Sequence, residues 1–400
     1  MHNVYEKMNY VDLMKHLDSL KPCALITTGR TGSDFLQSLL DSHTEVLTFN
    51  GIFLSHIFWE KSKCVNNRND ASVNLSDLLD EFIGLHIEKF KSRYDYIERK
   101  DCLGVEGNQS IQIDLKKFKF LVMSLLKEVD ITSKNFMLAV YGGYAMCLGQ
   151  DLIKKTVLLH HIHHVEKLPN YMKDFPNSKI LCMTRDPRAN FVSGIIHHRL
   201  YNVNSDNEVH LLFYIKRIII DAYSADKYSD DVITLKIEDL GDKCTLVSLC
   251  SWLGIHYEKT MNESTWGGLL WRGDRLSTKE NKEVGWSAKM LDNDWEERMS
   301  FKDKYIFNFL MYDRLVNYKY KSNKVHLYDY FIIPIIIFMP LEYELRFFTL
   351  KYLKICLIKR DYQIIAKNCI YYVGRVIFFY KVYFRKVLGF RFARKYISCE

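Results

Sequence analysis

The sequence lacks the features that mark secreted and membrane-spanning chains. Its ten cysteines include no Cys-x-x-Cys pair, and several lie in apolar runs, where a free thiol behaves as a small hydrophobe. A chain of 400 residues does not depend on disulfides, which favours a reducing, cytoplasmic compartment. The polar first 20 residues contain no apolar segment of a signal peptide. The longest apolar run, residues 331–341, is about half of the roughly twenty residues that a spanning helix needs.

The charge of the chain is distributed unevenly. Residues 321–400 hold fifteen Lys/Arg and five Asp/Glu, a local charge of +10, whereas the whole chain carries +8. The amino-acid composition also changes near residue 320, where the sequence becomes rich in aromatic residues, Ile, Lys and Arg. We therefore divide the chain into a main domain, residues 1–320, and a basic, aromatic, helical extension, residues 321–400.

Short apolar strands alternate with helical segments in the main domain. This alternation predicts an α/β fold with a parallel sheet covered by helices on both faces. The predicted strands are residues 23–28, 156–159, 179–184 and 232–236. The predicted helices are residues 33–40, residues 165–174, a helix from Pro187 with Asp186 as its N-cap, and a helix from 238 to the stop at Gly254.

The first strand leads into a glycine-containing turn at the start of a helix. Gly29 and Gly32 let the main chain approach a ligand closely, and successive N–H groups at a helix N-terminus form an anion-binding nest. The Gly-Lys-Ser/Thr sequence of a nucleotide-triphosphate P-loop is absent. Taken alone, the segment is equally compatible with an ordinary strand–turn–helix connection.

A second polar turn follows the strand at 179–184. Arg185 and Arg188 flank Asp186-Pro187, and Ser193 lies further along the following helix. A guanidinium and a hydroxyl in this arrangement can bind a second phosphate, although Arg-Asp-Pro-Arg alone could be a surface ion-pair cluster. Together, the two turns favour a ligand with two separated phosphate groups.

Both turns resemble motifs of the sulfotransferases that use 3′-phosphoadenosine 5′-phosphosulfate. That family has a loop Arg/Lys-Ser/Thr-Gly-Ser/Thr-x-Phe/Trp-Leu, which residues 30–36 match. Its 3′-phosphate motif is Arg-x-Pro-Arg with a serine five residues later, the interval from Arg188 to Ser193. Weaker matches lie in residues 235–255 and 271–286, so the resemblance covers about residues 22–315.

The resemblance implies a P-loop-like sulfotransferase fold and individual residue roles. Backbone amides of the first turn would hold the 5′-phosphosulfate, Arg30 would neutralise the leaving phosphate, and Phe35 would stack on adenine. The implied donor-binding residues are Thr28, Gly29, Arg30, Thr31, Gly32, Ser33, Phe35, Arg185, Ser193, Arg272 and Gly273. Two departures stand out: Asp34 replaces the family's Ser or Thr, and the Glu of a Gly-Glu-Ile/Leu-Phe element is missing after Gly51.

The run His160-His161-Ile162-His163-His164 supplies candidates for a general base. Sulfuryl transfer to a hydroxyl requires removal of the acceptor proton, and histidine has a suitable pKa near neutrality. A strand would place His161 and His163 on one face. His163 lies twenty-two residues before Arg185, which resembles the spacing in cytosolic sulfotransferases, so His163 is our first choice and His161 the second. A zinc pair formed by these two side chains, or purely structural histidines, are the alternatives.

The extension mixes aromatic and aliphatic residues with Lys and Arg at close spacing. Residues 321–400 could therefore contact a membrane interface peripherally, or they could form a helical cap whose aromatics pack on the main domain. No nucleic-acid recognition motif is present, so we expect no nucleic-acid partner.

These observations predict a sulfotransferase with a histidine base and no required metal. It would transfer a sulfuryl group from 3′-phosphoadenosine 5′-phosphosulfate to a hydroxyl or amine of a glycan, a glycolipid or another acceptor, and release 3′-phosphoadenosine 5′-phosphate. The expected location is cytoplasmic, with membrane association through the extension. A nucleotide phosphotransferase, and a degenerate protein that binds a nucleotide or a membrane without catalysis, are the competing interpretations.

Overall fold

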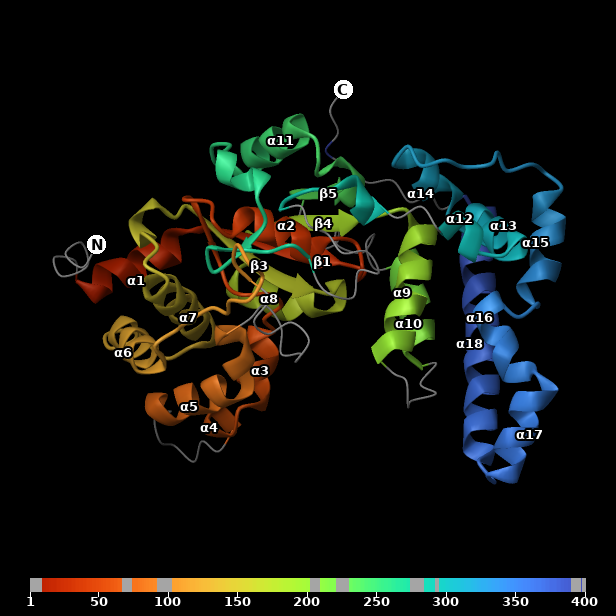
Figure 1. Ribbon diagram of the computed structural model, residues 1–400, viewed down its shortest axis with the longest axis horizontal. Helices are drawn as coiled ribbons and strands as arrows, with labels where there is room; N and C mark the ends of the chain where they lie inside the picture. The colour runs from red at the N-terminus through yellow and green to blue at the C-terminus, as the bar shows by residue number, and fades with distance from the viewer. Residues whose placement is uncertain are drawn as a thin grey trace.

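A five-stranded sheet forms the centre of the structure, a computed structural model that describes residues 9–66, 74–91, 103–201, 209–220, 230–273, 284–291, 295–389 and 397 (Figure 1). Its strands run in the order β2-β3-β1-β4-β5, and every pair is parallel. The strands are β1 (Lys21–Thr27), β2 (Val46–Thr48), β3 (Val157–His163), β4 (Lys179–Thr184) and β5 (Val232–Lys236). The predicted parallel sheet flanked by helices is therefore confirmed.

Both faces of the sheet are covered because the strands are apolar on both sides. Along β1, Ala24 and Ile26 belong to one core, whereas Cys23 and Leu25 belong to the other. Helices on the first face are α1 (Tyr10–Ser19), α5 (Leu75–His86), α6 (Leu115–Leu125) and α7 (Ser133–Cys147). Helices on the second face are α2 (Ser33–Leu40) and α11 (Lys243–Leu253).

A third core joins the main domain to the extension. It contains side chains from α9 (Pro187–Tyr201), α10 (Val209–Ile220), α12 (Trp295–Arg298), α13 (Phe301–Leu310), α15 (Asp329–Ile337) and α18 (Tyr362–Val387). The ring of Phe307 lies 4.7 Å from Phe191 and 6.2 Å from Phe379, between centroids. The helical extension is thus present, and it packs on the main domain; its division from residues 1–320 stays a prediction, since this core draws on both sides.

Polar contacts fix both ends of the extension. At its start, Arg188 donates a hydrogen bond of 2.6 Å to the carbonyl of Lys321. Near the C-terminus, the amide of Ile397 donates to the carbonyl of Thr234 on the edge strand β5, at 3.0 Å. Between these points run α15, α16 (Glu342–Leu345), α17 (Leu350–Ile358) and α18; α18 packs against α10, and α15 and α17 pack against α18 (Figure 1). None of the described helices is both long and apolar enough to cross a bilayer.

The remaining described helices and strands are α3 (Ser55–Lys61), α4 (Lys63–Asn66), α8 (Leu168–Asp174), α14 (Tyr312–Asn317) and the antiparallel pair β6 (Thr265–Trp266) and β7 (Leu269–Leu270). The cysteines are only in part the free thiols that the sequence suggests. Cys244, at the start of α11, takes part in a disulfide, whereas Cys23, Cys182 and Cys250 are free thiols in the core. The disulfide does not favour a reducing compartment, and the cytoplasmic location stays a prediction.

Candidate active site

Three sequence-predicted segments meet at the carboxyl edge of the sheet. In the strand order, β1 lies between β3 and β4, so the turn after β1, the histidines that end β3 and Arg185 after β4 leave neighbouring strands on the same side. This edge is where parallel α/β sheets usually bind ligands.

The turn after β1 has the backbone conformation of an anion nest. Gly29, Arg30 and Gly32 have positive φ angles of 85°, 55° and 80°, a tight turn that can direct several backbone N–H groups toward one anion. A Cβ at Gly32 would lie 2.4 Å from Cδ1 of Ile237, so both the backbone and the space require glycine there. Gly32 caps α2 without a side-chain hydrogen bond, which leaves the first amides of the helix to a ligand or to water.

Hydroxyl groups brace the turn from inside the protein. Thr27 and Thr31 are buried and their hydroxyls contact each other, while the Gly29 amide donates to Thr27 Oγ1 at 3.0 Å. The Thr28 hydroxyl accepts a hydrogen bond of 2.9 Å from Asn190 Nδ2 on α9. These hydroxyls are used within the protein, so the turn offers chiefly its backbone amides to an anion; Ser33, the first residue of α2, is also buried.

Positive charge from both turns gathers at one place. Arg30 Nε lies 3.4 Å from Ser193 Oγ, a direct contact between the two predicted motifs. Burial lowers the pKa of Arg185; the carboxylate of Glu238 opposes this effect, and the charge of Arg30 adds to it. The two guanidinium groups therefore repel each other, and an anion that binds between them would be stabilised.

Tyr214 of α10 connects the parts of this site. Its hydroxyl donates to Oδ1 of Asn190, and it also lies 3.0 Å from the carbonyl oxygen of Asn190 and 3.3 Å from that of Gly29. Burial raises its pKa, and the positive charges of Arg30 and Arg185 oppose that rise. No sequence pattern points to Tyr214, because it lies within an apolar helix and contacts the turn only through the tertiary fold.

The other arginine of the second turn has a structural role. Arg188 pairs with Asp186 through Nη2 at 2.6 Å, lies over the ring of Trp295 at 4.3 Å and holds the extension at Lys321. Asp186 also accepts from the Arg188 amide at 2.9 Å, as expected of an N-cap before Pro187. Arg185, which is 9% exposed, makes a long contact of 3.4 Å from Nη2 to the carbonyl of Met290, and its role in binding a ligand stays a prediction.

His161 and His163 form a linked pair at the end of β3. Nδ1 of His163 lies 3.4 Å from Nε2 of His161, whose Nδ1 lies 3.0 Å from Oε1 of Gln37. The register between β1 and β3 shifts at Leu25/Ile26, and His163 has a φ of 76°, so a bulge re-aims this residue. A Cβ at Gly29 would lie 4.0 Å from Nε2 of His163, which places that nitrogen against the first turn.

The two flanking histidines have structural surroundings. Nδ1 of His160 lies 2.6 Å from the Tyr141 hydroxyl, and its ring stacks on Tyr171 at 5.0 Å. Burial lowers the pKa of His160 to about 3, and burial with the charge of Arg217 lowers that of His164 to about 3. Both rings are therefore neutral at physiological pH, as expected of histidines that serve packing.

Asp34 turns toward the histidine pair. Its Oδ1 lies 3.6 Å from Nδ1 of His161, on the same side of that ring as Gln37. A carboxylate beside a phosphosulfate would be unfavourable, but next to an imidazole N–H it favours the tautomer with the proton on Nδ1. The departure of Asp34 from the family pattern therefore has a physical explanation here.

Three other predicted residues are less closely tied to the site. Phe35 is 4% exposed and belongs to the core between α2 and the sheet, so packing alone explains it and its adenine-stacking role stays a prediction. Arg272 donates to the carbonyl of Gly104 at 3.0 Å, and Gly273 has a φ of 90°. Neither residue has a recorded contact with Arg30 or Arg185 within the described ranges.

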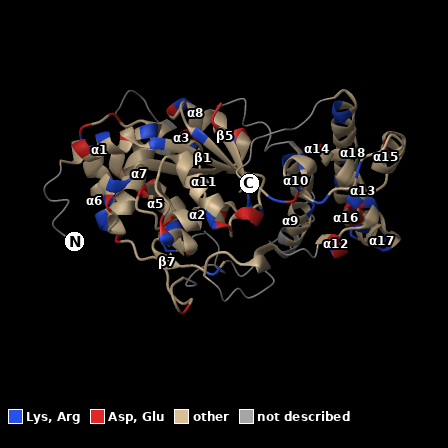
Figure 2. Ribbon diagram, turned by 90° about the horizontal axis from the view of Figure 1, so that it is seen from above, with Lys and Arg blue, Asp and Glu red and all other residues tan. Residues whose placement is uncertain are grey.

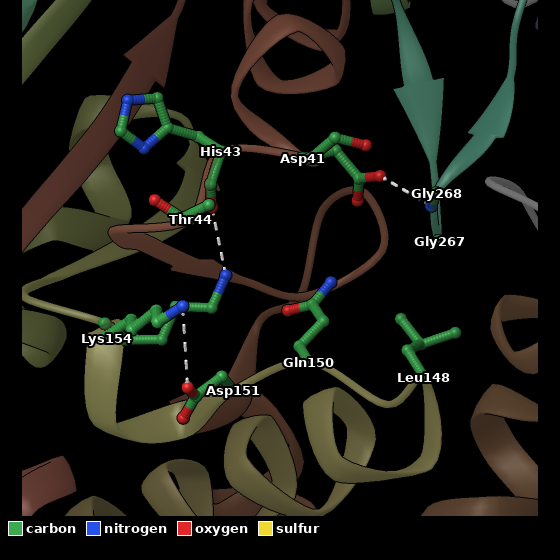
Figure 3. A pocket seen from close by; sticks show the side chains of 11 residues that line it. Asp41, His43, Thr44, Leu148, Gln150, Asp151, Lys154, Gly267 and Gly268 are labelled. Atoms are coloured by element: carbon green, nitrogen blue, oxygen red, sulfur yellow. Dashed lines mark hydrogen bonds and ion pairs between the residues drawn. The ribbon is translucent and has the colours of Figure 1, made fainter. Parts of the chain in front are cut away.

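A pocket lies at the opposite, amino edge of the sheet (Figure 3). Buried Asp41 accepts from the Gly268 amide at 3.0 Å, and Lys155, which precedes β3, donates to the carbonyl of His43 at 3.0 Å. His43, Glu45 and Glu258 have the spacing of metal ligands, but both His43 nitrogens are already hydrogen-bonded, to the Glu45 amide and to the His256 carbonyl. We therefore interpret this group as structural.

No protein-family model matches the sequence, and a search of curated proteins finds no match. Among solved structures, the chain is similar to the sulfotransferase domain of the Synechococcus PCC 7002 olefin synthase: 13% identity and a TM-score of 0.34, covering 70% of this chain and 88% of that one. It is also similar to the sulfotransferase STF9 from Mycobacterium avium, with 12% identity and a TM-score of 0.31, covering 64% of this chain and 71% of that one. Similarity at this level carries no information about activity.

Proposed function

We propose that the chain is a sulfotransferase that uses 3′-phosphoadenosine 5′-phosphosulfate and a hydroxyl-bearing acceptor. The observation that carries the proposal is the contact between the two motifs: Arg30 of the first turn reaches Ser193 of the second at 3.4 Å, with Arg185 beside them. A ligand bound there would meet two separate sets of anion-binding groups. This requirement fits a bisphosphorylated adenosine better than a nucleotide with a single phosphate chain.

Different residues would bind the two ends of the donor. The amides that follow Gly29, up to Ser33 at the N-terminus of α2, would hold the 5′-phosphosulfate, since the Gly29 amide already donates to Thr27. Arg30 would oppose the charge that develops on the leaving phosphate. Arg185 and Ser193 would bind the 3′-phosphate. The donor supplies an activated sulfuryl group, and positively charged groups and amide dipoles stabilise the transfer without a metal.

His163 would act as the base through Nε2, the nitrogen that faces the first turn. It takes the acceptor proton while the bond from sulfur to the acceptor oxygen forms and the bond from sulfur to the phosphate oxygen breaks, which leaves 3′-phosphoadenosine 5′-phosphate. For this role its proton must sit on Nδ1. His161 Nε2, 3.4 Å away, can accept that proton's hydrogen bond, since Gln37 and Asp34 favour a proton on the other nitrogen of His161.

Nucleotide binding tests the proposal directly. By calorimetry, the full chain should bind 3′-phosphoadenosine 5′-phosphate more tightly than 5′-AMP. Arg185→Ala should remove this preference, about 10- to 150-fold, because a charged hydrogen bond contributes about 1.5–3 kcal/mol. Arg188→Ala is the matched control, since its side chain already pairs with Asp186 and Trp295, and it should keep the preference.

Equal affinity of the unmodified chain for the two nucleotides would overturn the donor assignment. If the bisphosphate binds more tightly, the second test measures transfer of the sulfuryl group from labelled donor to a panel of glycans, glycolipids and small alcohols and amines. Tight binding of the bisphosphate without turnover on any acceptor would leave the degenerate, nucleotide-binding interpretation.

A further inference from the structure

The outward face of α15 is apolar and exposed. Leu327, Phe331, Ile335 and Phe338 are 77%, 71%, 68% and 59% exposed. Phe331 and Ile335 lie one turn apart on one side of α15, Leu327 lies in the turn before the helix, and Phe338 is its C-cap. The opposite side carries Ile333 and Ile337, which are buried in the third core. The helix is therefore apolar on the side that the protein covers and on the side that it does not.

This face continues onto α18. The ring of Phe338 lies 5.3 Å from that of Tyr380, which in turn lies 6.2 Å from Phe384. Phe384 belongs to a second exposed stripe at helical spacing, completed by Ile370, Val373 and Ile377. We call the exposed sides of α15 and α18 the apolar face. Monomeric soluble proteins rarely expose a continuous apolar surface of this kind, which marks contact with a partner or a membrane.

Positive charge accompanies the apolar face. Residues 326–388 contain ten Lys/Arg and four Asp/Glu, a net charge of +6, and the basic residues recur along α17 and α18 (Figure 2). Lys381 is exposed within the α18 stripe, where its aliphatic stem can lie along apolar surface while the ammonium reaches outward. Two of the acids are engaged inside the protein, since Glu344 pairs with Arg375 at 2.7 Å and Asp329 accepts from the His326 amide at 2.7 Å.

We infer that the apolar face is a docking surface for an anionic membrane. Apolar and aromatic side chains would enter the headgroup region, and the surrounding cations would contact anionic lipid headgroups. α15 has nine residues and contains Pro334, so it would lie in the plane of the interface. A second copy of the chain fits less well, because it would bring one positively charged surface against another.

Substitutions on this face should leave the fold intact. The face points away from the third core, which is closed by other side chains of the same helices, among them Ile333, Phe379 and Val382. The extension is also fixed at both ends, through Lys321 and Ile397. Point variants of the full chain are therefore preferable to its truncation, which would uncover that core.

Sedimentation with vesicles tests the inference. The full chain should pellet with vesicles that contain phosphatidylserine in phosphatidylcholine, and much less with phosphatidylcholine alone. The triple variant Leu327→Ser/Phe331→Ser/Ile335→Ser should partition at least tenfold more weakly. Lys381→Gln should weaken binding to the anionic vesicles by about fivefold, with a smaller effect at high salt. Leu85→Ser is the matched control: Leu85 is also an exposed leucine but lies on α5 in the main domain, and its loss should change nothing.

Circular dichroism would establish that each variant is folded. The inference is overturned if the full chain does not pellet with anionic vesicles, or if the triple variant pellets as well as the unmodified chain. It is also overturned if light scattering shows a dimer that the triple variant abolishes, since the face would then bind a second copy. None of these results depends on nucleotide binding, so failure here leaves the proposed function standing.

Discussion

A single methyl group at Gly194 should disturb the candidate site from outside it. Gly194 lies on α9 against Tyr214, and a Cβ there would lie 1.9 Å from Cε1 and 2.5 Å from Cζ of that ring. The ring must therefore move. Its hydroxyl would then lose the hydrogen bond that it donates to Asn190 and its contact with the carbonyl of Gly29, and the first turn would lose its support from α10.

The expected cost follows from these contacts. Overpacking costs about 1–3 kcal/mol, and the one lost hydrogen bond about 1 kcal/mol. The better helix propensity of alanine returns up to about 1 kcal/mol. Gly194→Ala should thus lower the free energy of unfolding by about 1–4 kcal/mol in urea titrations. It should also weaken the binding of 3′-phosphoadenosine 5′-phosphate, because the Gly29 backbone is no longer held.

Gly374→Ala is the matched control. Gly374 is a helical glycine of α18 that also faces α10, but its Cβ would meet only the end of the flexible Leu212 side chain, at 3.2 Å. The free energy of unfolding of Gly374→Ala should stay within about 1 kcal/mol of that of the unmodified chain. If Gly194→Ala unfolds and binds nucleotide like the unmodified chain, Tyr214 does not brace the first turn and that part of the reasoning fails.

Three further predictions concern the site and its surroundings. His163→Ala should lower transfer by about 10²- to 10⁴-fold with unchanged nucleotide affinity by calorimetry; retained turnover would exclude it as the base. Gly32→Ala should lower the free energy of unfolding by more than about 2 kcal/mol and abolish nucleotide binding, because Gly32 has a φ of 80° and its Cβ would collide with Ile237. Gly149 has a similar φ but no close neighbour, so Gly149→Ala should lower that free energy less. The pKa values of His160 and His164 are about 3 in the folded protein, against an ordinary value of 6.5. Below pH 6.5 the unfolded state therefore binds more protons at these two residues than the folded state does. Stability should therefore be full above that pH and fall by about 2 kcal/mol per histidine between pH 7 and 5, and His160→Asn should reduce the fall seen in urea titrations.

Local pattern was sufficient to predict most of the sheet. Residues 179–184 and 232–236 form β4 and β5 as predicted, because a short apolar run bounded by turn residues is typical of a buried strand and too short for a buried helix. The strand predicted at 156–159 continues to His163, since polar side chains concealed its end. The helix predicted from residue 238 begins at Lys243, because Asp242 provides the cap and a 3₁₀ turn precedes it.

The candidate site could be predicted only in part. Residues that follow neighbouring parallel strands must lie near one another, so the proximity of Arg30, Ser193 and the histidines followed from the fold class. The contributions of Tyr214 and Glu238 could not be predicted, because they depend on how distant helices and turns pack. Phe35 illustrates the reverse case: the motif suggested a ligand contact, whereas an aromatic ring in the first turn of an apolar helix also satisfies the core.

The attachment of the extension at both ends has a geometric consequence. A protein tethered to a bilayer by a free tail samples many heights and tilts, but here the chain leaves the main domain beside Arg188 and returns to it at β5. If the protein docks through α15 and α18, the carboxyl edge of its sheet would lie at one fixed height and orientation above the lipid. Such a rigid spacer would select acceptors by how far their reactive hydroxyl projects from the bilayer, independently of the chemistry around that hydroxyl.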